Sequence, residues 1–103
     1  MRYKFAMAIS LDVLTKATGG TSCYCLESVP FAISVFFRHP TDFRAGIFEA
    51  VNAGGDTDSN ASMVGALIGA NVGMTGIPEG MLHLPFEAEP VIALADEFMD
   101  AIA

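Results

Sequence analysis

Residues 51–73, with the sequence VNAGGDTDSNASMVGALIGANVG, are the stretch around which the rest of the chain is arranged. They place two carboxylates and a hydroxyl within four residues, at Asp56, Asp58 and Ser59. Two glycines stand immediately before them, and glycine permits positive φ and close approach of another backbone. Small residues at helical spacing follow. The stretch therefore predicts a junction between a loop and a helix that carries oxygen ligands.

The composition indicates one small and unusually apolar domain. Of the 103 residues, 52% are apolar and 17% are charged, and the mean hydropathy is +0.48. Because a single core usually needs about 100 to 150 residues, the chain is one domain at most, or part of one. Two interpretations of the apolar excess stay open. It fills a compact core rich in alanine and glycine, or it forms faces that pack against another chain.

The charge and hydropathy patterns exclude several partners. Five Lys and Arg against twelve Asp and Glu give a net charge of -7. This leaves too few cations to release counterions from a phosphate backbone, so we expect no nucleic acid partner. No apolar run reaches the roughly 18 to 20 residues that a membrane span needs, and the amino terminus lacks the pattern of a signal peptide. We therefore expect a soluble, cytoplasmic protein without a membrane partner.

The cysteines and histidines do not suggest a metal site. Cys23 and Cys25 are the only cysteines, and their spacing matches no zinc pattern and rarely closes a disulfide. We expect buried free thiols. His39 and His83 stand far apart, next to proline or leucine residues. Each is expected in a loop or at a helix end rather than as a base or a ligand.

Hydrophobic periodicity predicts an all-α fold, without strand-like alternation. The helices that we expect are Tyr3–Lys16, Cys23–Arg38 with a kink or restart at Pro30, Asp42–Asn52, a helix from Asp56 or Thr57 onward, a short turn after Pro78, and a last helix from Pro90 to Ile102. Glycines and small hydroxyl residues separate the first two helices, which is the composition of a turn. The last helix is expected to carry one apolar face, made of Val91, Leu94, Ala95, Phe98 and Ile102.

The helix predicted over 42–52 has Thr41 as its expected N-cap. Its expected buried face consists of Phe43, Ile47, Phe48 and Val51. Gly54 and Gly55 then end the helix in the left-handed conformation that helix carboxyl ends favour.

The following helix carries small residues every three or four positions. They are Ser62, Gly65, Ala66, Gly69, Ala70 and Gly73. Glycine in a helix interior costs about 1 kcal/mol relative to alanine, so several glycines on one face indicate close approach of a neighbouring helix. The other sides hold Met63, Val64, Leu67, Ile68 and Val72. We therefore expect a central helix that is buried nearly all round.

Asp56 and Asp58 allow two interpretations. One is a capped helix start, which stabilises by roughly 0.5 to 2 kcal/mol. The other is a metal site, because two carboxylates this close repel each other unless a cation joins them. A calcium-binding EF-hand loop is excluded, since Ala61 and Leu67 stand where glycine and a bidentate glutamate are required. A phosphate-binding P-loop is excluded because no lysine follows the glycines. The all-oxygen set suits Mg²⁺ or Mn²⁺.

These residues carry a family resemblance. The run AVNAGGDTDSNA, followed by GALIGA and then IPE, resembles the carboxy-terminal motif of the ADP-ribosylglycohydrolase family. The upstream run ESVPFAISVFFR, Glu27–Arg38, resembles the helix that precedes this motif, and the match continues in order from about Gly20 to Leu82. The resemblance implies that residues 1–103 form a single all-α domain, similar to the carboxy-terminal third of such a protein. It also implies a compact multi-helix bundle around the buried Gly/Ala-rich helix.

The resemblance implies a hydrolase that uses two Mg²⁺ or Mn²⁺ ions to cleave the glycosidic bond between ADP-ribose and a side chain. By position in the motif, the implied carboxy-terminal metal ligands are Asp56, Asp58 and Ser59, with Asp58 as the bridge between ions. The implied substrate-binding loop consists of Gly20, Thr21, Ser22 and Cys23, which match a segment near the bound adenosine. The implied partner is ADP-ribose or an ADP-ribosylated protein.

The chain departs from the family in one respect. Members are much longer, and their amino-terminal motifs GDxxG and TDDT, which supply the other metal ligands and the acidic catalytic group, are absent from this sequence. The metal site is therefore expected to be partial, and the catalytic residues stay unassigned.

Two functions remain open. The chain is the carboxy-terminal part of a hydrolase whose missing ligands come from a complementary fragment, or it is a non-catalytic, self-associating helical domain in which the aspartates cap a helix.

Overall fold

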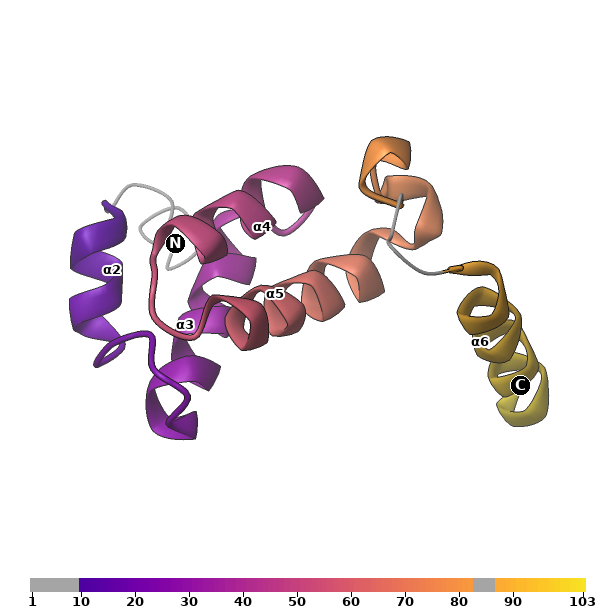
Figure 1. The fold of residues 1–103 in the computed structure, drawn as a ribbon, viewed down its shortest axis with the longest axis horizontal. Helices are drawn as coiled ribbons and strands as arrows, with labels where there is room; N and C mark the ends of the chain where they lie inside the picture. Colours follow the sequence, from indigo (N-terminus) through magenta and orange to yellow (C-terminus); the bar gives the residue numbers. More distant parts are fainter. Residues whose placement is uncertain (1–9, 83–86) are drawn as a thin grey trace.

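The structure, a computed structural model, describes residues 10–82 and 87–103, and every regular element within these ranges is helical (Figure 1). The α-helices are α2 (Leu11–Ala17), α3 (Cys25–Arg38), α4 (Phe43–Asn52), α5 (Thr57–Val72) and α6 (Glu89–Ile102). Two short 3₁₀ helices, η1 (Met74–Gly76) and η2 (Glu79–Leu82), follow α5. The predicted all-α class is confirmed.

Helix α5 is the centre of the packed body, because both α3 and α4 lie against it and α2 adds to the core from α3. In Figure 1 these helices form one group on the amino-terminal side of the molecule. The buried apolar residues are Leu14, Phe31, Ala32, Val35, Ala50, Val64 and Ile68. The predicted bundle around the Gly/Ala-rich helix is confirmed.

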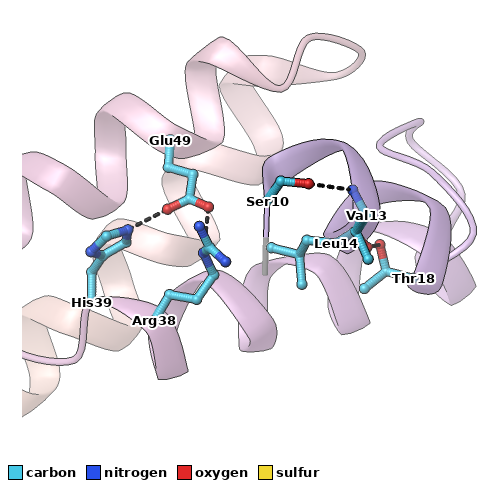
Figure 2. A network of polar contacts seen from close by, with 7 residues as sticks. All are labelled: Ser10, Val13, Leu14, Thr18, Arg38, His39 and Glu49. Atoms are coloured by element: carbon cyan, nitrogen blue, oxygen red, sulfur yellow. Dashed lines mark hydrogen bonds and ion pairs between the residues drawn. The ribbon is translucent and has the colours of Figure 1, made fainter. Parts of the chain in front are cut away.

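The boundaries of the first two helices differ from the prediction. Residues 3–9 of the expected first helix, like His83, lie outside the described residues. The described part begins after Ser10, whose Oγ accepts a hydrogen bond from the backbone N–H of Val13 at 3.3 Å (Figure 2). Helix α3 begins at Cys25 rather than Cys23 and continues through Pro30 without a restart.

A polar cluster joins α3 to α4. The Glu49 carboxylate on α4 pairs with Arg38 Nε at 2.5 Å and with the ring of His39 (Figure 2). The Glu49 side chain is only 10% exposed. His39 is the C-cap of α3, which confirms its predicted place at a helix end.

The start of α4 differs from the prediction. Asp42, not Thr41, is the N-cap, and its Oδ1 accepts from the backbone N–H of Ala45 at 3.0 Å. The carboxylate is a charged acceptor close to the free N–H groups of the first turn, and it therefore makes a better cap there.

The predicted buried face of α4 is confirmed only in part, because Phe43 and Ile47 are half-buried and Phe43 packs against the core. Phe48 and Val51 are 54% and 47% exposed, whereas Gly46 and Ala50 are buried. The reason is the close approach of α5: a Cβ added at Gly46 would lie 2.3 Å from Ile68 Cδ1. The helices meet through small residues, so the bulky side chains of α4 lie beside or away from the contact.

The expectation for α5 is half confirmed. Gly65 does permit close approach, because a Cβ there would lie 3.2 Å from Ile47 Cδ1 of α4. The helix is not buried all round, since Ser62, Ala66 and Ala70 are exposed. Helices α3 and α4 and the short η1 contact α5, and together they leave this side of the helix open.

Helix α6 stands apart from the packed body in Figure 1. Its bounds agree with the prediction, and the expected apolar face is present by spacing. All of its residues are nevertheless exposed, including Leu94 at 65% and Phe98 at 61%. Within residues 10–82 and 87–103, none of the helices combines the length and hydrophobicity required to cross a bilayer.

Candidate metal and substrate site

The two predicted aspartates lie at the amino-terminal end of α5. Asp56 is at the N-cap position, yet its side chain makes no capping hydrogen bond. Asp58 is exposed in the first turn, and its Oδ1 accepts from the backbone N–H of Ser59 at 2.9 Å. Ser59 is exposed as well. The predicted ligands therefore sit together at the positive end of a helix dipole, where negative charge is favoured.

The two carboxyl groups interact with each other. The pKa of the Asp58 carboxyl is held below its ordinary value. The larger cause is hydrogen bonding with Asp56, and the smaller is the hydrogen bond from the Ser59 backbone N–H. Asp58 is therefore ionised at neutral pH. A pair of neighbouring carboxylates attracts a proton or a cation into the space they share.

The loop before Asp56 has the conformation that the sequence predicts. Gly54 and Gly55 both have positive φ, at 77° and 70°. Gly55 also packs against Thr21: an added Cβ would lie 2.4 Å from both the carbonyl oxygen and the Oγ1 of Thr21. Only glycine fits at position 55, and its absent side chain lets the segment around Thr21 approach.

Thr21 joins the predicted substrate loop to the predicted metal segment. Its carbonyl oxygen accepts from the backbone N–H of Asp56 at 2.9 Å and from Nδ2 of Asn60 at 2.9 Å. These partners are more than thirty residues away in sequence. The structure thus brings together the two segments that were proposed separately.

Asn60 is a site residue that sequence reasoning missed. It is fully buried in the first part of α5, in line with Val64 and Ile68. A polar residue at the first position of an i, i+4, i+8 buried stripe is the signal that could have found it.

Glu27, in the first turn of α3, shapes the rest of the loop. Its Oε2 accepts from the Ser22 backbone N–H at 3.3 Å and pairs with the Ser22 hydroxyl. Gly20, with φ at 133°, lies against the same carboxylate, and an added Cβ would be 3.1 Å from Oε2. Glu27 therefore holds Gly20 and Ser22 in place. Sequence reasoning had not assigned it to the site.

The expected burial of the thiols is wrong. Cys23 and Cys25 are free and exposed, in the loop before α3 and at its first residue. Beside the loop is an open hollow of about 460 Å³, lined by Thr15, Lys16, Gly19, Gly20, Thr21 and Ala53. Gly20 and Thr21 face this hollow, whereas Cys23 does not line it.

The donor set fits part of a coordination shell. Carboxylate and hydroxyl oxygens from Asp56, Asp58 and Ser59 are the hard donors that Mg²⁺ and Mn²⁺ prefer. Within residues 10–82 and 87–103, no three His, Cys, Asp or Glu side chains are grouped so as to hold a metal. The described residues therefore offer an incomplete set, which needs water or further ligands.

Fold and site together describe an all-α protein that carries two carboxylates and a hydroxyl at a helix amino terminus, beside a glycine-rich loop. The sequence profile described as ADP-ribosylglycohydrolase matches residues 4–103, and the chain belongs to this family.

Individual relatives agree with this assignment. The chain is 33% identical, over 62% of its length, to the ADP-ribosyl-dinitrogen reductase glycohydrolase of Rhodospirillum rubrum, of which it covers 21%. It is 37% identical, over 66% of its length, to ADP-ribosylhydrolase ARH3 of Mus musculus, of which it covers 20%. It is 45% identical, over half of its length, to an uncharacterized protein of Archaeoglobus fulgidus, of which it covers 16%. The chain thus spans about a fifth of the relatives' length, and no solved structure matches it.

Proposed function

We propose that this chain supplies the carboxy-terminal part of the metal site of an ADP-ribosylglycohydrolase, which hydrolyses the bond between ADP-ribose and a modified side chain. The observation that carries the proposal is the junction at Thr21, where the loop and the donor segment share two hydrogen bonds. In this proposal the loop, which is held close to the carboxylate pair, positions ADP-ribose near the metal donors.

In this proposal each residue has a separate task. Asp58, ionised and exposed, and Asp56 beside it provide negative charge for one or two divalent cations, and Ser59 adds a hydroxyl oxygen. The loop Gly20–Cys23 positions ADP-ribose. Mg²⁺ or Mn²⁺ held by these residues would supply Lewis acidity for the hydrolysis. The remaining ligands and the catalytic acid come from another part of the family fold, which we propose is a complementary fragment.

A second candidate function is a non-catalytic, self-associating helical domain. The exposed apolar residues of α6 favour it, because large exposed apolar faces mark interaction surfaces. The absent capping bond at Asp56 speaks against it, since this function keeps the aspartates as caps.

A matched pair of substitutions separates the two functions. Asp42 makes a real capping bond and Asp56 does not. We expect Asp42→Ala to lower the unfolding free energy by about 1 kcal/mol and to leave Mn²⁺ binding intact. Asp56→Ala should abolish Mn²⁺ binding with a smaller loss of stability. Calorimetric titration and thermal unfolding measure both. Undiminished Mn²⁺ affinity in Asp56→Ala would show that the ligand assignment is wrong.

A further inference from the structure

We infer that Asn60 is the positioning residue of this site: its buried amide holds the Gly20–Cys23 loop in register with the carboxylate pair. As a role in ADP-ribose binding, this rests on the proposed function. As a statement about the loop, it rests on the geometry alone.

The first argument is the convergence of contacts on one carbonyl. The Thr21 oxygen accepts both the Asp56 N–H and the Asn60 amide, each at 2.9 Å. The Asp56 N–H belongs to a residue with a proposed metal-donor side chain, so the Thr21 carbonyl ties the loop to the segment that carries the carboxylates. Asn60 fixes this carbonyl from a rigid position inside α5.

The second argument is the cost of keeping an asparagine there. Asn60 is fully buried, and its Oδ1 has no hydrogen-bond partner among the described residues. A buried acceptor without a partner destabilises a fold, whereas an apolar residue would extend the stripe of Val64 and Ile68. Stability alone therefore does not account for an amide at this position, but its bond to Thr21 does.

The third argument is that the contact depends on residues on both sides of the junction. Gly55 lies so close to Thr21 that no side chain fits between them, and Asn60 reaches the same oxygen from α5. Asn71 provides a comparison within the same helix. Its Nδ2 donates to the Pro40 carbonyl at 2.8 Å, far from the aspartates and on an exposed surface.

The test compares Asn60→Ala with Asn71→Ala. Each substitution removes one hydrogen bond that a side-chain amide of α5 donates to a loop carbonyl. Hydrogen exchange of the Asp56 N–H in the free chain should become roughly fivefold faster in Asn60→Ala and stay unchanged in Asn71→Ala. Alanine is a better helix former than asparagine, so faster exchange would not reflect a weakened helix. Unchanged Asp56 exchange in Asn60→Ala, or equal acceleration in both variants, would overturn the inference.

A second pair covers the case in which Asn60→Ala does not fold. Gly55→Ala forces Thr21 away, whereas Gly54→Ala introduces similar backbone strain where nothing lies within 4 Å. Only Gly55→Ala should speed Asp56 exchange, and equal effects would contradict the inference.

ADP-ribose titration in the presence of Mn²⁺ is the functional arm. We expect roughly fivefold weaker ADP-ribose binding in Asn60→Ala with Mn²⁺ affinity retained. Equal ADP-ribose affinity in Asn60→Ala and the unaltered chain would overturn the positioning role. If the unaltered chain binds neither compound, the proposed function fails, and the exchange rates still decide what Asn60 does.

Discussion

At the scale of single residues, the site depends on polar groups placed at the ends and edges of helices. Asp56 and Asp58 face each other at the start of α5, and Glu27 and Asn60 hold the loop beside them. The sequence motif was sufficient to predict that the aspartates lie at the start of a helix and that Gly54 and Gly55 are left-handed. Glu27 and Asn60 were missed because their partners are set by tertiary packing, which periodicity does not describe.

The lowered pKa of Asp58 predicts a pH dependence. Because the folded chain favours the ionised carboxylate, Asp58 contributes stability that is fully present above the pKa that its carboxyl has in the unfolded chain. This contribution is lost as the pH falls through the lower folded pKa. The difference in melting temperature between the unaltered chain and Asp58→Asn should be constant above about pH 5 and shrink below about pH 4. Thermal unfolding across this range checks it, and a difference that grows on acidification would contradict the assignment.

At the scale of elements, the crossing of α4 and α5 is set by small residues. The helix periodicity correctly predicted both helices, and the glycines predicted a close approach. The prediction failed for half of the face of α4, because Phe48 and Val51 share the spacing of a buried stripe on a helical projection but are exposed in the structure. Which side of an amphipathic helix meets its neighbour depends on how near the backbones come, and that distance is set here by Gly46.

The glycines of this crossing should respond differently to alanine. At Gly69 an added Cβ has nothing nearer than 3.9 Å, so Gly69→Ala should stabilise by about 0.5 to 1 kcal/mol through helix propensity. At Gly46 the added Cβ meets the buried Ile68 at 2.3 Å, and overpacking should outweigh the same gain, giving a net loss of about 1 kcal/mol. Urea unfolding of both variants measures this. Stabilisation by Gly46→Ala would show that the crossing is looser than described.

At the scale of the whole molecule, the described residues combine a packed body of α2 to α5 with an exposed α6 (Figure 1). The sequence predicted the apolar face of α6, since spacing alone defines such a face. It did not predict that the face lies open, because burial depends on what packs against it. The chain spans about a fifth of the length of its relatives.

The exposed face of α6 predicts self-association of the isolated chain. We expect sedimentation to give species larger than a monomer at chain concentrations of roughly tens of micromolar. Phe98→Lys should shift these species toward the monomer. Ala93→Lys makes the same charge change on the opposite side of α6 and should have a smaller effect. Neither substitution should lower the melting temperature of the chain by much, because every residue of α6 is exposed. A monomer at these concentrations in the unaltered chain would contradict the prediction.

The most direct test of the central claim is calorimetric titration of the chain with Mn²⁺ and then with ADP-ribose, in the unaltered sequence and in Asp58→Asn. The claim that Asp56, Asp58 and the Thr21 loop form one site predicts saturable binding of both, lost in the variant. Absence of binding in the unaltered chain, or equal binding in Asp58→Asn, would contradict it and leave the motif with a purely structural role.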